Sequence, residues 1–199
     1  VKYIISEQGI SATTLARKYN VGLAGSDYQV VLQDPEVEGV IIATKHDLHA
    51  SILLHALQYP KHLFVEKPLC IFPQELEALQ NAWHNSPVLS LQIGFNRRFA
   101  PLAIQMKALL GTAPMQVTTT MNAGHLPADF WLHHREKGGG RIVGEACHHI
   151  DFVAYLTGSK ACAVCMNGFG PHPSAITDNA TILIQYENGS TGVINYFSN

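Results

Sequence analysis

The first half of the chain alternates short apolar runs rich in β-branched residues with amphipathic stretches. This alternation is typical of parallel strands joined by crossover helices, and it predicts an α/β domain. Compact apolar runs beside turn residues predict strands over residues 1–5, 39–44, 61–66 and 88–94. Helices are predicted between them over residues 11–19, 47–59 and 73–85. Ser11 and Asp47 can cap the first two helices, and Pro73 suits the first turn of the third.

Beyond Phe99 the pattern changes, which predicts a second domain. A helix over residues 100–110 is followed by the run 115–123, a polar glycine-rich stretch and a helix over residues 145–156. Strand-like runs over residues 162–169, 180–187 and 191–197 predict an antiparallel sheet, with a hairpin turn at Asn188-Gly189. We place the boundary near residues 94–101, between a partial parallel-sheet domain (1–96) and a partial domain with a mostly antiparallel open sheet (97–199).

Both domains are expected to be incomplete. A doubly wound domain normally opens with a strand and a glycine-rich turn into a helix that holds a dinucleotide pyrophosphate. No G-x-G-x-x-G run stands in this sequence, so weak or no dinucleotide binding is expected of the chain by itself. At the other end, Tyr196 to Asn199 follow directly on a predicted hairpin strand, which leaves a small sheet with an unpaired edge. The natural protein is therefore expected to continue at both ends.

Composition argues against several classes of partner. The chain has 199 residues, of which 47% are hydrophobic, and a formal net charge of -2. It can therefore bury a sizeable core, and it lacks the excess basic charge that binds nucleic acid. Its apolar runs are strand-sized, well short of the roughly 20 residues that a membrane span needs. The chain opens without a basic leader or a cleavage site, so a cytoplasmic location is expected.

Cysteine and histidine do not predict a metal site. Four cysteines are too few for a disulfide scaffold at this size, so reduced thiols are expected. Cys162 and Cys165 have the spacing of a zinc or redox pair, but residues three apart on a strand point to opposite faces. The adjacent histidines at 133–134 and 148–149 diverge on any regular element. A zinc protein that uses Cys147 with the histidines is the third and least favoured hypothesis.

The first candidate for catalytic chemistry is Lys67, at the carboxyl end of the predicted strand 61–66. Pro68 biases this lysine away from the helical region, so its ammonium is displayed at the edge where open α/β sheets bind ligands. It can contact a substrate hydroxyl or a cofactor ribose there. The alternative is a surface lysine paired with Glu66. The Lys67-Pro68 bond is also predicted to be cis, because X-Pro bonds adopt that form at little cost.

The second candidate is His148, on a helix that follows three glycines at positions 138–140. Glycine permits close approach of the backbone to a ligand. Oxidation of an alcohol needs a group that takes the hydroxyl proton, and a histidine pKa of about 6.5 suits that task at neutral pH. A lysine pKa of about 10.4 would need a large depression. We therefore predict His148 as the acid/base and Lys67 as its polarising partner, the alternative for His148 being a core or capping histidine.

Four segments resemble, in order and spacing, the glucose-fructose oxidoreductase and inositol dehydrogenase family, called Gfo/Idh/MocA. They are residues 34–49, Glu66-Lys67-Pro68, Asn96 to Pro101, and the glycine-histidine helix from Gly138 to Asp151. The resemblance covers nearly the whole chain. It implies a Rossmann domain, a second α/β domain with an open sheet, and NAD(P)-dependent hydride transfer to or from a sugar, sugar-nucleotide or polyol.

The resemblance also implies roles for individual residues. It makes Lys67 and His148 the catalytic pair. NAD or NADP is the implied cofactor, and a small sugar-like molecule is the substrate, with no metal ion. A homo-oligomer is expected to form through the C-terminal sheet. The residues implied beside the cofactor are Thr44, His49, Glu66, Lys67 and Arg97, and those implied beside the substrate are Lys67, Glu145, His148 and Asp151.

Two departures from the family pattern leave alternatives open. Gly144 stands four residues before His148, where many members have an acid, and the displaced Glu145 points about 100° away on a helix. After the predicted strand 1–5, Glu7 would bind a ribose diol and favour NAD, whereas Ser6 in that place would leave room for the 2′-phosphate of NADP. A non-catalytic family member that acts as a binding or assembly module is the alternative to an active oxidoreductase.

Overall fold

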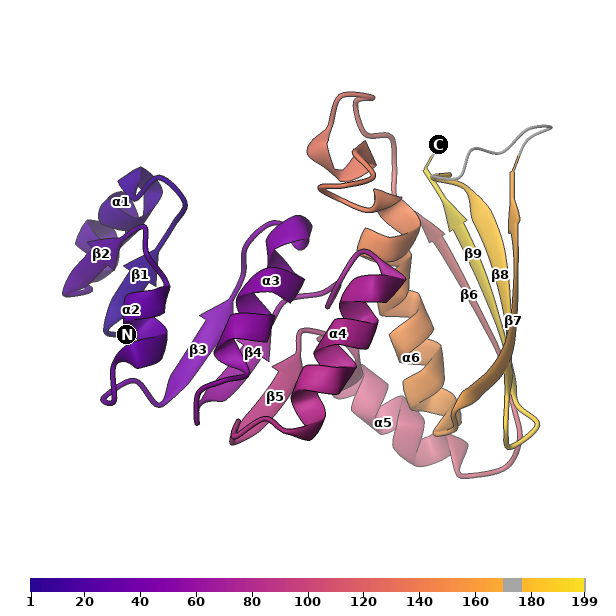
Figure 1. Cartoon of the computed structure of the whole chain (residues 1–199). Helices are drawn as coiled ribbons and strands as arrows, with labels where there is room; N and C mark the ends of the chain where they lie inside the picture. Colours follow the sequence, from indigo (N-terminus) through magenta and orange to yellow (C-terminus); the bar gives the residue numbers. More distant parts are fainter. Residues whose placement is uncertain (170–176, 199) are drawn as a thin grey trace.

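The chain forms three sheets. The computed structural model describes residues 1–169 and 177–198 (Figure 1), so Asn199, the last residue of the predicted second domain, lies outside the described residues. A two-stranded and a three-stranded parallel sheet occupy the first half, and a four-stranded, mostly antiparallel sheet occupies the second half. The predicted fold class, an incomplete parallel α/β sheet followed by an α/β domain with a mostly antiparallel open sheet, is confirmed.

The first sheet pairs two three-residue strands in parallel. They are β1 (Tyr3–Ile5) and β2 (Leu23–Gly25), with α1 (Ile10–Tyr19) between them and α2 (Gln29–Gln33) after them. The sequence pattern predicts neither β2 nor α2. Segments this short do not complete enough of a hydrophobic period to be distinguished from loop.

Two predicted helix caps are wrong. α1 begins after Gly9, so Ser11 lies inside the helix, and the hydroxyl of Ser6 accepts the N–H of Ala12 instead. α3 begins after Lys45, which places Asp47 in the first turn, where a carboxylate still interacts favourably with the helix dipole. Pro73 does occupy the first turn of its helix, as predicted.

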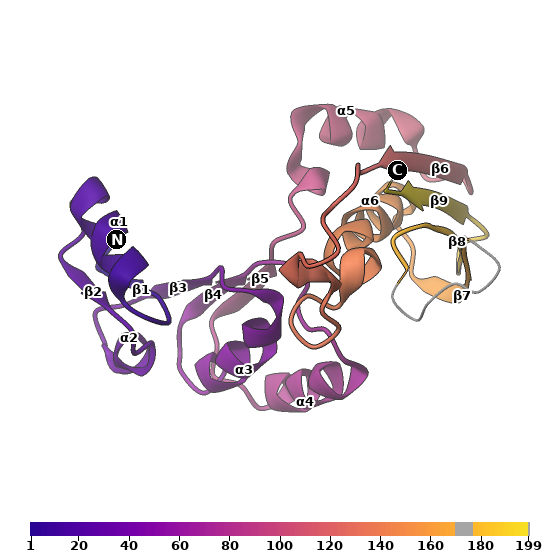
Figure 2. The same cartoon turned by 90° about the horizontal axis from the view of Figure 1, so that it is seen from above.

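The second sheet consists of three parallel strands covered on one side by two helices (Figure 2). Side chains of β4 and β5 that face the helices, such as Leu63 and Val65, join the apolar core with Leu53 of α3 and Leu79 of α4. The strands end one or two residues before the predicted limits. The elements, in order, are β3 (Gly39–Ile42), α3 (His46–Ala56), β4 (His62–Val65), α4 (Pro73–His84) and β5 (Ser90–Ile93).

The parallel strands do not form one continuous sheet. β1 pairs only with β2, and β3 pairs only with β4, so β1 and β3 each have an unpaired edge within the described residues. Figures 1 and 2 show these two strands side by side with a space between their ribbons. The face of the second sheet away from α3 and α4 is open to solvent, since Ile41 of β3 is 75% exposed.

The second half places one long helix on a four-stranded sheet. The sheet has the order β6-β9-β8-β7, with β6 parallel to β9 and the other pairs antiparallel. The turn between β8 and β9 contains Asn188 and Gly189, as predicted. The elements, in order, are η1 (Arg97–Phe99), α5 (Pro101–Leu110), β6 (Gln116–Asn122), η2 (Trp131–His133), the π-helical turn η3 (Ile142–Ala146), α6 (Cys147–Thr157), β7 (Ala161–Gly168), β8 (Ala180–Tyr186) and β9 (Thr191–Phe197).

A glycine allows α6 to pack closely on this sheet. Val153 of α6 is fully buried among Ile182, Ile184 and Ile194 of the central strands. A Cβ on Gly192 of β9 would lie 2.8 Å from Val153 Cγ1, so only glycine fits there. The absence of a side chain at position 192 therefore allows the close approach of α6 to β9.

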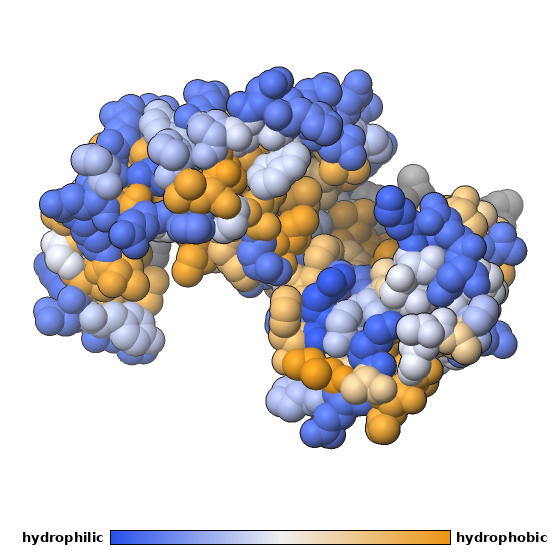
Figure 3. Space-filling view, turned by 90° about the horizontal axis from the view of Figure 1, so that it is seen from below, coloured by the Kyte–Doolittle hydropathy of each residue, from blue (hydrophilic) through white to orange (hydrophobic). Residues whose placement is uncertain are grey.

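The surface carries several apolar patches between polar regions (Figure 3). On α5, Leu102 is 75% exposed and Leu109 is 88% exposed. None of the described helices is long and apolar enough to cross a membrane.

Candidate functional site

Lys67 lies where the first-half sheet meets the second half of the chain. β4 ends at Val65, and the bond between Lys67 and Pro68 is cis, as predicted. The Lys67 ammonium donates a hydrogen bond of 2.8 Å to the carbonyl oxygen of Gly144, 77 positions further along the chain. This bond joins the carboxyl end of a parallel strand, the edge where α/β sheets bind ligands, to the segment that leads into α6.

Gly144 lies in the π-helical turn η3, which spans Ile142–Ala146. The sequence predicts an α-helix from residue 145, so the first two residues of that predicted helix belong to the π turn instead. Single π turns interrupt regular i→i+4 pairing and occur often at functional sites. No side chain fits at position 144, because a Cβ there would lie 2.8 Å from Leu132 Cδ1 and 2.9 Å from His46 Cε1. Close packing against Leu132 and His46 therefore explains why position 144 is a glycine in this chain, where many family members have an acidic residue.

Glu66 is fixed beside Lys67 by the neighbouring strands. Its main-chain N–H donates to the carbonyl of Ile42, and its Oε2 accepts from the N–H of Lys67 at 3.3 Å. A Cβ on Gly94, which follows β5, would lie 2.8 Å from the same Oε2. Lys67 forms no ion pair with Glu66 among the residues described, so the alternative of a surface ion pair is not what the structure shows.

His148 lies in the first turn of α6, four residues after Gly144. Its pKa is lowered to about 4, first by burial and then by the positive charges of Lys67 and Arg97. Phe95 approaches the ring edge-on, with ring centroids 6.3 Å apart. Nδ1 is buried without a hydrogen-bond partner among the described residues, so Nε2 is the ring nitrogen left to meet a ligand. At pH 7 the ring is neutral and able to accept a proton.

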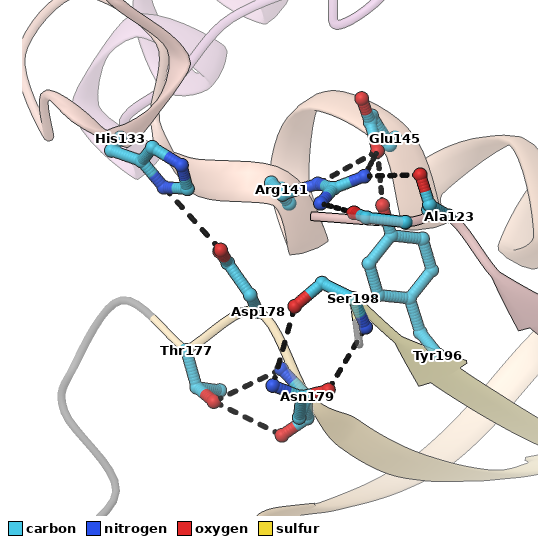
Figure 4. Close-up of polar contacts among 10 residues, drawn as sticks. Ala123, His133, Arg141, Glu145, Thr177, Asp178, Asn179, Tyr196 and Ser198 are labelled. Atoms are coloured by element: carbon cyan, nitrogen blue, oxygen red, sulfur yellow. Dashed lines mark hydrogen bonds and ion pairs between the residues drawn. The ribbon is translucent and has the colours of Figure 1, made fainter. Parts of the chain in front are cut away.

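Glu145 is held by donors from the second half of the chain (Figure 4). Its Oε2 accepts hydrogen bonds from Nε and Nη2 of Arg141, at 3.0 and 2.9 Å, and from the hydroxyl of Tyr196. Arg141 is 1% exposed and also donates to the carbonyl oxygens of Ala123 and Gly124. Burial raises the pKa of the Tyr196 phenol, and its bond to Glu145 raises that pKa further. Oε1 of Glu145 has no partner in the described part of the chain and remains open to a ligand.

Two adjacent arginines make different contacts with α6. Nη1 of Arg97 lies 3.1 Å from Nε2 of His149, and the pKa of that histidine is lowered first by burial and then by this guanidinium. Arg97 also lines an open cavity of about 520 Å³ between α5, α6 and β6. Arg98 forms an ion pair with Asp151. The structure therefore brings Asp151 to Arg98, and its role as a substrate ligand stays a prediction.

Thr44 and His49 lie between the end of β3 and the first turns of α3. His49 is fully buried, with Nδ1 2.7 Å from the carbonyl oxygen of Pro68 and Nε2 3.0 Å from that of Thr44. The ring thus links the main chain that follows β3 to the main chain that follows β4. The Thr44 hydroxyl donates to the carbonyl of Lys45 at 3.3 Å. Contact of either side chain with a cofactor stays a prediction.

Three residues that shape this site, Arg141, Tyr196 and His46, are not predicted as site residues from the sequence. Arg141 had a detectable signal, because Glu145 stands four positions later and such pairs meet on a helix. Tyr196 and His46 had none, since their partners are 51 and 92 positions away. His133, considered only as a metal ligand, instead lies 3.4 Å from Asp178 (Figure 4).

The cysteines do not form a cluster with other metal-binding side chains. All four are free, and no group of three or more potential metal ligands occurs within residues 1–169 and 177–198. Cys162 and Cys165 are exposed on β7, whereas burial raises the pKa of the Cys147 thiol to about 11. The thiol of Cys147, next to His148, is therefore protonated at neutral pH.

Two family models match almost the whole chain. The model described as "Oxidoreductase family, NAD-binding Rossmann fold" matches residues 1–95. The model described as "GFO/IDH/MocA C-terminal domain" matches residues 110–199. The Rossmann match precedes the C-terminal-domain match along the chain. Lys67 lies within the first match and His148 lies within the second.

Curated relatives are similar over most of this chain. An uncharacterized oxidoreductase of Bacillus subtilis (strain 168), YrbE, is 28% identical over 204 residues, which cover 98% of this chain and 58% of the relative. The scyllo-inositol 2-dehydrogenase (NAD(+)) of the same organism is 27% identical over 191 residues, covering 91% of this chain and 54% of the relative. The chain thus spans a little over half the length of these relatives.

A solved structure has the same fold over the full chain. Levoglucosan dehydrogenase, in complex with NADH and levoglucosan, superposes with a TM-score of 0.84 at 25% identity. The match covers 100% of this chain and 58% of that chain. The likeness therefore extends over both halves of the chain together.

Proposed function

This chain belongs to the Gfo/Idh/MocA family of NAD-binding oxidoreductases, and from that premise we propose that it carries the catalytic centre of a sugar or polyol dehydrogenase. The hydrogen bond between Lys67 and Gly144 carries the proposal, because it brings the predicted catalytic lysine to the turn that precedes His148. Support comes from relatives named as inositol and levoglucosan dehydrogenases. Because the chain spans little more than half the length of these relatives, we propose the activity and the substrate class for the whole protein.

His148 acts as the base in alcohol oxidation. Its lowered pKa keeps the ring neutral at pH 7, so Nε2 can take the proton of a substrate hydroxyl as hydride leaves the same carbon. Lys67 donates a hydrogen bond to the same oxygen and stabilises the negative charge that develops on it. In the reverse direction the protonated ring returns the proton to a carbonyl oxygen. NAD(H), when bound, supplies the carbon that accepts or releases the hydride.

The nicotinamide end of a dinucleotide fits at the carboxyl ends of β3 and β4. Thr44 and Glu66 follow these two strands, and the ring of His49 links their main chains. Arg97 is included in the proposed cofactor site from the family resemblance. The sequence supplies no glycine-rich cradle for the pyrophosphate, so tight binding needs a version extended upstream through a strand and such a turn.

We favour NAD(H) over NADP(H). The Ser6 hydroxyl, after β1, is already engaged as an acceptor for the N–H of Ala12 at 3.1 Å. The next residue, Glu7, is exposed, so its carboxylate is free to accept hydrogen bonds from a ribose diol. A carboxylate in that place repels a 2′-phosphate.

Glu145 contributes to substrate binding through its open Oε1. The three donors on Oε2 fix the carboxylate, so Oε1 is a pre-oriented acceptor for a sugar or polyol hydroxyl one residue away from the Lys67 contact. A neutral polyhydroxylated substrate suits this arrangement. A substrate with a carboxylate at the same place would be repelled.

The outer face of the four-stranded sheet is our candidate for a homo-oligomer interface. Cys165, Leu183 and Val193 are aligned across β7, β8 and β9, and Leu183 is 45% exposed. The next row is polar, with the Thr181 hydroxyl bonded to Asn195. A cytoplasmic location is part of the same proposal.

The test is steady-state oxidation of scyllo-inositol, myo-inositol and levoglucosan with NAD⁺ and NADP⁺ by the protein with the flanking sequence that its gene encodes. We expect turnover with at least one substrate, and a loss of about 10²-fold or more in kcat/KM for Lys67→Met and His148→Asn. Calorimetric titration of NADH into the same proteins separates the outcomes. NADH binding without turnover on any polyol would favour the non-catalytic alternative that Gly144 suggests.

A further inference from the structure

A loop of the second half docks on the start of α3. We call residues 131–140 the docking loop. Nδ1 of His46 lies 2.8 Å from the carbonyl oxygen of Gly138, and the N–H of Asp47 donates to the carbonyl oxygen of Lys137 at 3.2 Å. The ring of Trp131 meets the ring of His46 edge-on, with centroids 4.8 Å apart. Two hydrogen bonds and one aromatic contact thus join the two halves of the chain at a single helix start.

His46 also packs against the π turn. Its ring is 8% exposed, and its Cε1 would lie 2.9 Å from a Cβ at position 144. Because Gly144 has no side chain, the ring rests directly on the main chain whose carbonyl accepts from Lys67. One imidazole therefore contacts the chain both before and after Arg141.

Two glycines of the docking loop pack closely against the rest of the chain. A Cβ on Gly138 would lie 2.3 Å from the carbonyl oxygen of Leu132, and one on Gly139 would lie 2.9 Å from Ile71 Cγ2. Gly139 also has a positive φ of 75°, a backbone conformation that residues with a side chain rarely adopt. Gly138 and Gly139 thus lie against the rest of the chain more closely than any residue with a side chain could.

The tautomer of His46 follows from its surroundings. Burial lowers the pKa of this ring, so it is neutral at pH 7 and carries one N–H. A carbonyl oxygen only accepts, so Nδ1 must be the protonated nitrogen. Nε2 has no hydrogen-bond partner among the described residues.

We propose that His46 is a positioning residue: its Nδ1–H bond to Gly138 and its contact with Gly144 set where the π turn lies, and so how Lys67 and His148 face one another. The inference rests on the proposed function, for which it names a residue outside the catalytic pair. If His46 contributed packing alone, substitution by an apolar side chain of similar size would leave the reaction rate unchanged. The hydrogen bond requires a donor at the Nδ1 place.

Two variants distinguish the effect of the Nδ1–H hydrogen-bond donor from the effect of the size of the side chain. His46→Asn keeps an amide donor near the position of Nδ1, and His46→Leu keeps bulk without a donor. In the oxidation assay we expect His46→Leu to lower kcat by about 10²-fold, with the KM for NAD⁺ unchanged, and His46→Asn to stay within about threefold of the wild type. His55→Leu, an exposed histidine in the last turn of the same helix, is the matched control and should leave kcat unchanged. Equal kcat values for His46→Leu and wild type, with only a lower melting temperature, would overturn the proposal.

A second measurement does not depend on activity. In ¹⁵N-histidine NMR spectra of the protein, His46 should carry its proton on Nδ1, and His46→Leu should shift the His148 imidazole signals while His46→Asn leaves them in place. Unshifted His148 signals in His46→Leu overturn the positioning role. Shifted signals in a protein that turns over no polyol support it, and locate the failure in the proposed reaction instead.

Discussion

The ammonium of Lys67 donates a 2.8 Å hydrogen bond to the carbonyl oxygen of Gly144, which joins the end of β4 to the π turn before α6. This single bond brings together two motifs that lie in different domains of the family fold. It also explains why His148, four residues later, is influenced by the charge of Lys67. The proposed catalytic pair is thus brought together by the contact between the two halves of the chain, so we expect changes at this contact to alter chemistry as well as stability.

Replacing Lys67 with Met should change the protonation of His148. Part of the lowering of the His148 pKa to about 4 comes from the Lys67 charge, so the variant should have a higher His148 pKa. The acid limb of the pH-rate profile for oxidation should then move to higher pH, because only the neutral ring accepts a proton.

The measurement is an NMR pH titration of His148, with Lys67→Arg as the variant that keeps the positive charge. We expect Lys67→Arg to retain the low pKa of His148. An unchanged His148 pKa in Lys67→Met would show that the Lys67 charge does not contribute to its lowering.

The order of the main helices and strands could be predicted from the sequence, because their apolar runs are long enough to show the spacing of a helix or of a strand. The predicted strand 61–66 and helix 73–85 correspond to β4 and α4 within about two residues. Lys67 and His148 could be proposed as site residues because each lies near a local signal, the proline after Lys67 and the glycine run before His148. The π turn, the separation of β1 from β3 and the contacts of His46 could not be predicted, because each depends on residues far apart in sequence.

Gly94→Ala should weaken cofactor binding without unfolding the protein. The added Cβ would lie 2.8 Å from Oε2 and 3.1 Å from Cα of Glu66, so the carboxylate and the end of β4 must move. We expect a higher Kd for NADH in a protein extended through the glycine turn. Gly22→Ala is the control, because nothing lies within 4 Å of its Cβ, and its stability should change by less than about 0.5 kcal/mol. Equal Kd values for the two variants would remove Glu66 from the cofactor site.

Tyr196→Phe should destabilise the chain. Its hydroxyl is a buried donor to the Glu145 carboxylate, and loss of a hydrogen bond to a charged group costs about 1.5–3 kcal/mol. Tyr186→Phe is the matched control, since Tyr186 is equally buried on β8 but its hydroxyl has no partner among the described residues. Removing that unpaired group should be neutral or stabilising. Urea unfolding of both variants checks the pair, and equal losses of stability would contradict the assigned bond.

Thiol reactivity should divide the cysteines into two classes. Cys162 and Cys165 are exposed, whereas burial raises the pKa of Cys147 to about 11 and also raises the pKa of Cys70. At pH 8, iodoacetamide should therefore modify Cys162 and Cys165 quickly and Cys147 only after unfolding, because the thiolate is the reacting form. Peptide mass spectrometry identifies the modified sites. Rapid modification of Cys147 in the folded protein would mean that the start of α6 opens in solution.

Stability should fall as the pH drops from about 6.5 to about 4. In the folded chain the pKa of His148 is lowered to about 4, whereas an unfolded histidine titrates at about 6.5. Between these values the unfolded state binds a proton that the folded state does not, so the free energy of unfolding rises with pH across this window and levels off above it. His46 and His149 have lowered pKa values too and act in the same direction.

His148→Asn removes one of these three groups, so its unfolding free energy should depend less steeply on pH than that of the wild type between pH 4 and 6.5. Urea unfolding at several pH values measures both slopes. His84→Asn, which replaces an exposed histidine at the end of α4, should keep the wild-type slope. If His148→Asn keeps that slope as well, the pKa of His148 is not lowered in the folded protein, which would contradict the buried, charge-flanked setting assigned to its ring.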